Sequence, residues 1–149
     1  MGPAAPTIAG FDRQYLIRVL QEFREGERES TIMGRIMTGF RPGEIRRMAG
    51  YFTAQTWESA DVELDWAGVE HGRAIHEESC VECHQEGGRH QDRDTPRIAG
   101  QWPTYLVFQL ESFRDRPMSL RQPSKMREAL EALSDDDLRA LAQYYASER

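Results

Sequence analysis

The sequence lacks long hydrophobic runs and any excess of positive charge. No stretch approaches the roughly 18 consecutive apolar residues that a membrane-spanning helix needs, and the mean hydropathy is -0.70. The 19 basic residues are outnumbered by 25 acidic ones, which gives a formal net charge of -6. That sign opposes binding to a phosphate backbone. We therefore expect no membrane span and no nucleic-acid partner.

Cysteine is scarce, and the features of a secretion signal are missing. The only cysteines are Cys80 and Cys83, too few for a disulfide-stabilised scaffold. Because two residues separate them, they are better placed to hold a bound group than to join distant segments. Residues 1–6 (MGPAAP) lack the basic start and apolar run of a signal peptide.

What the sequence does contain is an internal repeat. Its 149 residues, 39% of them hydrophobic, allow one ordinary domain or two small ones. Residues 6–10 (PTIAG) return as residues 96–100 (PRIAG), and further matches follow at an offset of 90 and then, after an insertion, of 93. The matched pairs are Tyr15/Tyr105, Leu16/Leu106, Leu20/Leu110, Phe23/Phe113, Arg24/Arg114, Met33/Met126, Phe40/Leu133, Ile45/Leu138, Ala49/Ala142 and Tyr51/Tyr144.

The apolar spacing within the repeat predicts helices. Leu106, Leu110 and Phe113 fall on one helix face. Ser134 is a candidate N-cap of the last helix, and Gly72 is expected to let an earlier helix pack closely against it. No strand-like alternation appears, so we predict an all-α fold.

The repeat also predicts the division of the chain. Residues 1–57 correspond to the carboxy-terminal half of a domain, residues 58–66 to an acidic linker, and residues 67–149 to a complete domain. A half domain of this kind is expected to expose core surface, which a partner subunit could cover.

Residues 80–84 (CVECH) form the motif that predicts a bound cofactor. The C-x-x-C-H pattern is typical of covalent c-type haem attachment, in which two thiols add across the haem vinyl groups and the adjacent histidine ligates the iron. Cys80 and Cys83 on one short turn can reach both vinyl groups while His84 points at the metal. The surrounding helical domain, of cytochrome size, strengthens this interpretation.

Two other uses of the cysteines are weaker. Structural zinc needs two more ligands, and although His71, His76 and His90 are nearby, no second Cys/His pair has zinc-finger spacing. A thioredoxin-like dithiol calls for a βαβ context, which the sequence does not suggest. We expect the three histidines to be solvated helix and loop residues.

The distal iron ligand is expected to be a methionine, because a thioether gives the high potential of an electron carrier. Met126 is the preferred candidate, since it precedes the last helix where the repeat also places Met33. Met118, in the Arg-Pro-Met insertion at residues 116–118, is the alternative. The alternative for either residue is a core methionine that fills a gap in the packing.

Three further residues are candidates for the haem pocket. Pro96 is expected to turn the chain so that a backbone carbonyl accepts the Nδ1 hydrogen of His84. Trp102 and Tyr105 could line the pocket or donate to a haem propionate, although core packing explains them equally well.

Together these residues resemble class I cytochromes c, especially the two-domain periplasmic group. Within that group the chain looks like the cytochrome subunits of flavocytochrome c sulfide dehydrogenases, and the likeness covers essentially the whole chain. The stretches that carry it are residues 2–9 (GPAAPTIA), 30–36 (STIMGRI), 48–52 (MAGYF) with Gln55 and Thr56, 80–88 (CVECHQEGG) and 99–102 (AGQW).

The resemblance implies electron relay rather than catalysis by this chain. A partner flavoprotein would oxidise sulfide at its own FAD, and the cytochrome would pass single electrons to a soluble acceptor such as another cytochrome c. It implies one covalent haem c here, attached to Cys80 and Cys83, with His84 and Met126 as axial ligands.

The departure from this family is at the amino terminus. A dihaem member would have another C-x-x-C-H motif upstream of Gly2, and Met33 matches the distal ligand of that first haem. Either the sequence lacks a natural amino-terminal stretch with an export signal, or this member has lost one haem. Because bacteria attach c-type haem outside the cytoplasm, we expect a periplasmic protein and favour a missing stretch.

Overall fold

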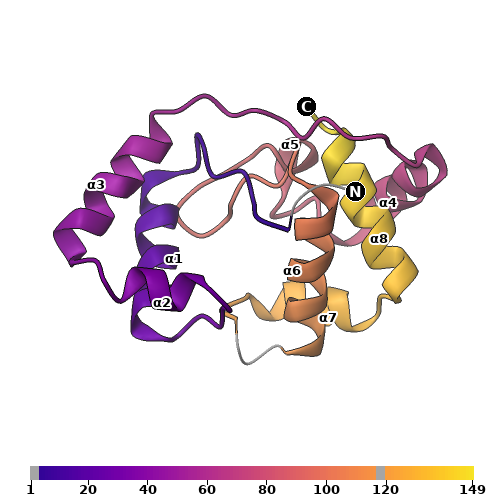
Figure 1. The fold of residues 1–149 in the computed structure, drawn as a ribbon. Coiled ribbons are helices and arrows are strands. Elements are labelled where there is room, and N and C mark those ends of the chain that lie inside the picture. The colour runs from indigo at the N-terminus through magenta and orange to yellow at the C-terminus, as the bar shows by residue number, and fades with distance from the viewer. Residues whose placement is uncertain (1–3, 117–119) are drawn as a thin grey trace.

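The computed structural model describes residues 4–116 and 120–149, and every regular element in those ranges is a helix (Figure 1). The predicted all-α fold is confirmed. None of the helices in the described ranges combines the length and the apolar character needed to cross a membrane. In chain order the helices are α1 (Arg13–Glu25), α2 (Met33–Met37), α3 (Pro42–Thr53), α4 (Trp66–Ser79), α5 (Gln85–Gly88), α6 (Pro103–Asp115), α7 (Ser124–Glu131) and α8 (Asp135–Ser147).

Helices α1 to α3 form the first group. The side chain of Asp12 caps α1 by accepting a hydrogen bond from the Tyr15 N–H at 2.9 Å. Gly26 ends the helix with a φ of 76°, a left-handed conformation suited to glycine. α1 packs against both α2 and α3. The buried residues between these helices are Phe11, Tyr15, Leu16, Leu20, Met37, Ile45 and Ala49.

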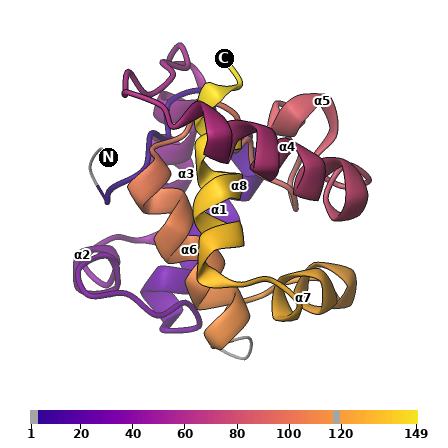
Figure 2. The ribbon, with the colours of Figure 1, turned by 90° about the vertical axis from the view of Figure 1, so that its right-hand side faces the viewer.

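Helices α4 to α8 form the second group, in which α8 packs against both α4 and α6 (Figure 2). Ser134 and Asp137 form a capping box at the start of α8, as predicted for Ser134. A Cβ at Gly72 would collide with the carbonyl oxygen of Ala140, so glycine is what allows α4 to cross α8 closely. The buried core of this group consists of Val69, Ile75, Leu106, Leu141, Ala142, Tyr144 and Tyr145.

The two groups repeat the same hydrogen bonds, at the offsets found in the sequence. Gly10 and Gly100 even share the left-handed conformation, with φ values of 71° and 72°. The equivalent bonds run from Gly10 N–H to Phe52 O (2.8 Å) and Gly100 N–H to Tyr145 O (2.7 Å), and from Arg24 Nε to Phe40 O (3.0 Å) and Arg114 Nη1 to Leu133 O (3.1 Å). The sequence repeat is therefore a structural repeat.

The two copies of the repeat, the first containing α1 to α3 and the second α4 to α8, differ in what covers the last helix of each. In the second copy α4 lies on α8, and Tyr144 is 4% exposed. The corresponding Tyr51 on α3 is 63% exposed, because no helix among the described residues lies on that face. Tyr51 is thus left exposed where its counterpart is covered, and the interpretation of the first copy as a half domain stays a prediction.

Glutamine side chains join the two copies by bonding to backbone. Gln101, 1% exposed, donates to the Thr7 carbonyl and accepts from the Thr7 N–H, both at 2.9 Å. Gln91 donates to the Gly10 carbonyl at 2.9 Å and accepts from the Asp12 N–H at 3.0 Å. These reciprocal bonds fix the two copies against each other.

The connection between the copies, residues 54–65, is not helical, and α4 begins at Trp66. It is nevertheless partly packed. Ala60 is 1% exposed and donates to the Gly100 carbonyl at 2.7 Å, while Trp57 stacks on Phe11. The division of the chain at residues 58–66 stays a prediction.

Candidate functional site

The motif at residues 80–84 forms one turn at the end of α4. The Cys80 carbonyl accepts hydrogen bonds from the N–H groups of Cys83 at 3.3 Å and His84 at 2.9 Å. Both thiols are free, with Cys80 half-buried and Cys83 exposed. Burial raises the pKa of the Cys80 thiol. The turn therefore brings two thiols and an imidazole together, as the sequence predicted.

His84 presents a neutral imidazole in a protected position. Burial, with smaller contributions from His76 and His90, lowers the pKa of His84 to about 4. Its Nδ1 is buried and has no hydrogen-bond partner among the described residues. Such an unpaired polar atom is costly, and the neutral ring is the form that ligates a metal. Two free thiols beside this imidazole fit a covalently attached haem c.

Pro96 does not fix His84 in the way expected. Because Nδ1 of His84 is unpaired in the described structure, the hydrogen bond to a carbonyl at Pro96 is not formed. The residues that follow Pro96 are instead held by Gly88, whose carbonyl accepts hydrogen bonds from the N–H groups of Ile98 and Ala99 at 2.9 and 3.0 Å. A haem-pocket role for Pro96 stays a prediction.

Trp102 and Tyr105 lie at the start of α6, and both are half-buried. Burial raises the pKa of the Tyr105 hydroxyl, which also interacts electrostatically with Tyr15 and Arg28 of the first copy. Tyr105 therefore faces the junction between the copies. Whether these two side chains line a haem pocket stays a prediction.

Met126 lies in the first turn of α7 and is half-buried. The adjacent Lys125 donates to both carboxylate oxygens of Glu82, at 2.9 and 3.0 Å. Since Glu82 lies between the two cysteines, the start of α7 is held beside the haem-attachment turn. Met33, the repeat counterpart, begins α2. Met118 lies outside the described residues, and the choice of Met126 stays a prediction.

The prediction that all three other histidines are solvated is wrong for His76. This ring is 3% exposed because α4 packs on α8, where it contacts Tyr144 and Tyr145. Its Nδ1 lies 3.0 Å from the Tyr145 hydroxyl. His71 and His90 are more exposed and pair with carboxylates. No group of three or more potential metal-ligating His, Cys, Asp or Glu side chains gathers within the described residues.

Tyr145 is a site residue that the haem-attachment motif alone does not identify. Its hydroxyl contacts both His76 and the Cys80 thiol, and its ring centroid lies 6.3 Å from that of His84. The sequence repeat does distinguish Tyr145, because the residue at the equivalent position of the first copy is Phe52. The hydroxyl is thus specific to the copy that carries the motif.

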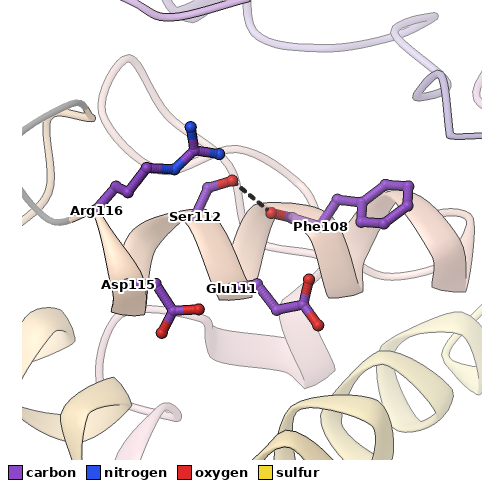
Figure 3. Close-up of a pocket in the computed structure, with 5 residues that line it drawn as sticks. All are labelled: Phe108, Glu111, Ser112, Asp115 and Arg116. Carbon is purple, nitrogen blue, oxygen red and sulfur yellow. Dashed lines mark hydrogen bonds between the residues drawn. The ribbon is translucent and has the colours of Figure 1, made fainter.

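A separate surface hollow lies along the exposed side of α6 (Figure 3). It is lined by Phe108, Glu111, Ser112, Asp115 and Arg116, and the Ser112 hydroxyl donates to the Phe108 carbonyl at 2.7 Å. None of the predicted haem-site residues lines it.

Comparisons with known sequences identify related proteins. Residues 69–147 match the cytochrome c family model. The thiosulfate dehydrogenase electron acceptor of Stutzerimonas stutzeri is 30% identical over 99% of this chain and 74% of its own length. Cytochrome c4 of Pseudomonas aeruginosa is 27% identical over 95% of this chain and 75% of its own length.

Solved structures share the fold. Cytochrome c4 of Acidithiobacillus ferrooxidans superposes with a TM-score of 0.85 at 24% identity, over 99% of this chain and 91% of that one. A thiosulfate dehydrogenase from Marichromatium purpuratum superposes with a TM-score of 0.82 at 29% identity, over 98% of this chain but only 33% of that one. The narrower likeness to sulfide dehydrogenase cytochrome subunits stays a prediction. The chain belongs to the cytochrome c family of electron-transfer proteins.

Proposed function

We propose that this chain is a periplasmic electron-transfer subunit that carries one haem c. It accepts electrons from a dehydrogenase that oxidises a reduced sulfur compound and passes them to a soluble acceptor such as another cytochrome c. The observation that carries the proposal is the turn at residues 80–84, where two free thiols lie beside a neutral imidazole with an unpaired Nδ1.

Each residue of the site has a distinct role in holding the group. The Cys80 and Cys83 thiols would hold a haem c through two thioether bonds. The imidazole of His84 and the thioether of Met126 would ligate its iron. Bound there, haem c supplies a one-electron iron centre whose potential the methionine sulfur raises. Tyr145, packed beside Cys80 and His84, would help to exclude water from the bound group.

A thiosulfate-oxidising dehydrogenase is the favoured electron donor. Two lines of similarity support it: the relative from Stutzerimonas stutzeri is described as the electron acceptor of such an enzyme, and one solved thiosulfate dehydrogenase contains a region of this fold. The second candidate is a sulfide-oxidising flavoprotein that carries FAD on its own chain, favoured by the stretch at residues 30–36.

Haem attachment is tested by expression with the haem-maturation machinery. We expect the protein to gain the mass of one haem, and Cys80→Ala with Cys83→Ala to gain none because no thiol is left to form a thioether. Ser79→Ala, an exposed change beside the motif, is the matched control and should bind haem normally. An unmodified polypeptide mass for the wild-type protein contradicts the proposal.

The electron donor is tested by rapid mixing of the oxidised holoprotein with each candidate. Haem reduction by a thiosulfate dehydrogenase and thiosulfate supports the favoured donor. Reduction only by an FAD-dependent sulfide dehydrogenase and sulfide selects the second. If neither pair reduces the haem, both donor assignments are wrong, although haem attachment stands on its own measurement. Fractionation of the native cells tests the periplasmic location.

A further inference from the structure

One ion pair joins the two segments that carry the proposed axial ligands. The ammonium group of Lys125 lies 2.9 and 3.0 Å from the two carboxylate oxygens of Glu82. Glu82 stands within the haem-attachment motif, two residues before His84, and Lys125 immediately precedes Met126. Lys125 is also the single lysine of the chain. The pair therefore connects the proximal segment to the distal one.

The charges around this pair favour its formation. Lys125 and Glu82 are oppositely charged at neutral pH, and the ammonium group reaches both carboxylate oxygens. Both side chains are exposed, so the pair is accessible to salt and contributes little to folding by itself.

The position of α7 gives the ion pair a role other than stabilising the fold. α7 packs against α6, and it lies on the same side of α8 as the carboxy-terminal end of α4 (Figure 2). The Glu82–Lys125 pair is a direct link from α7 to the haem-attachment turn. Such a link restricts how far the first turn of α7, and Met126 with it, can move away from that turn.

We propose that the Glu82–Lys125 ion pair positions Met126 as the distal ligand and keeps other ligands from the iron. The inference rests on the proposed haem site. When the pair is broken, the first turn of α7 moves away more often. In the haem-bound protein the Met126 sulfur would then leave the iron more often, and an external nitrogen ligand would take its place without any change in oxidation state.

Imidazole binding to the oxidised holoprotein tests this role, because imidazole can bind only when Met126 leaves. Glu82→Gln and Lys125→Gln should each raise the apparent imidazole affinity by up to about fivefold at low salt, the range expected of an exposed ion pair. The difference should vanish at high salt. Lys125→Arg and the charge-swapped double variant Glu82→Lys with Lys125→Glu should restore the wild-type affinity.

Arg139→Gln is the matched control, because Arg139 forms a similarly exposed pair with Asp136 within α8. It should bind imidazole like the wild type. Wild-type affinity in both Gln variants, or no restoration by the charge swap, overturns the inference. If Glu82→Gln impairs haem attachment, Lys125→Gln and Lys125→Arg decide. A wild-type protein that carries haem but lacks the methionine charge-transfer band overturns the ligand assignment together with this inference, and a protein without haem overturns the proposed function itself.

Discussion

Met126 and Met33 occupy equivalent positions in the two copies, but only Met126 lies beside a haem-attachment turn. Met126→Ala should remove the sulfur-to-iron charge-transfer band and lower the reduction potential, because the distal thioether is lost. Absorption spectra and potentiometric titration measure both. Met33→Ala is the matched control and should keep the band. Loss of the band in Met118→Ala instead would show that the distal ligand was assigned to the wrong residue.

His76 is the residue whose environment the sequence did not reveal. Burial lowers its pKa from the ordinary value of 6.5, so below pH 6.5 the unfolded chain binds a proton more readily than the folded one. The free energy of unfolding should therefore fall as the pH drops below 6.5. His76→Gln keeps a hydrogen-bonding group near Tyr145 but cannot titrate, so denaturant titrations should show a weaker dependence in that range. An unchanged dependence would assign the effect to another group.

At the scale of elements, the crossing of α4 and α8 depends on a single glycine. Gly72→Ala would drive a methyl group into the Ala140 carbonyl and should lower the free energy of unfolding by about 1–3 kcal/mol or more. Gly50→Ala on α3 is the matched control, since its new Cβ would meet only the Arg13 side chain, at 3.8 Å or more. Denaturant unfolding of both variants tests the difference. Equal stabilities would mean that α4 can shift without cost.

The same crossing shows how far the sequence could predict this fold. Apolar spacing predicted α6 and the Ser134 cap predicted α8, because these are local signals. The turn at residues 80–84 was equally predictable, since its ligands are neighbours in the chain. The burial of His76 was not, because it depends on α8, nearly 70 positions away. The pairing of Glu82 with Lys125, 43 positions apart, was hidden for the same reason.

At the scale of the whole molecule, the first copy is held to the motif-bearing copy by buried side-chain bonds to backbone. Gln101 pairs with both backbone polar groups of Thr7, although residues 54–65 already connect the copies covalently. The connecting segment is itself fixed to the second copy through Ala60. Such bonds between distant segments cannot be deduced from either copy alone, and they make the two copies a single structural unit.

Substitution of Gln101 tests whether the two copies form a single structural unit. Gln101→Ala leaves the Thr7 N–H and carbonyl without these partners, which should lower the free energy of unfolding by about 1–3 kcal/mol. Hydrogen exchange should become faster in α1 and α3 than in α8, because the first copy loses its attachment while the core of the second is unchanged. Gln55→Ala is the control, since Gln55 is exposed and bonds only to the nearby Tyr51 carbonyl. Uniformly faster exchange in all three helices would instead indicate that both copies unfold together.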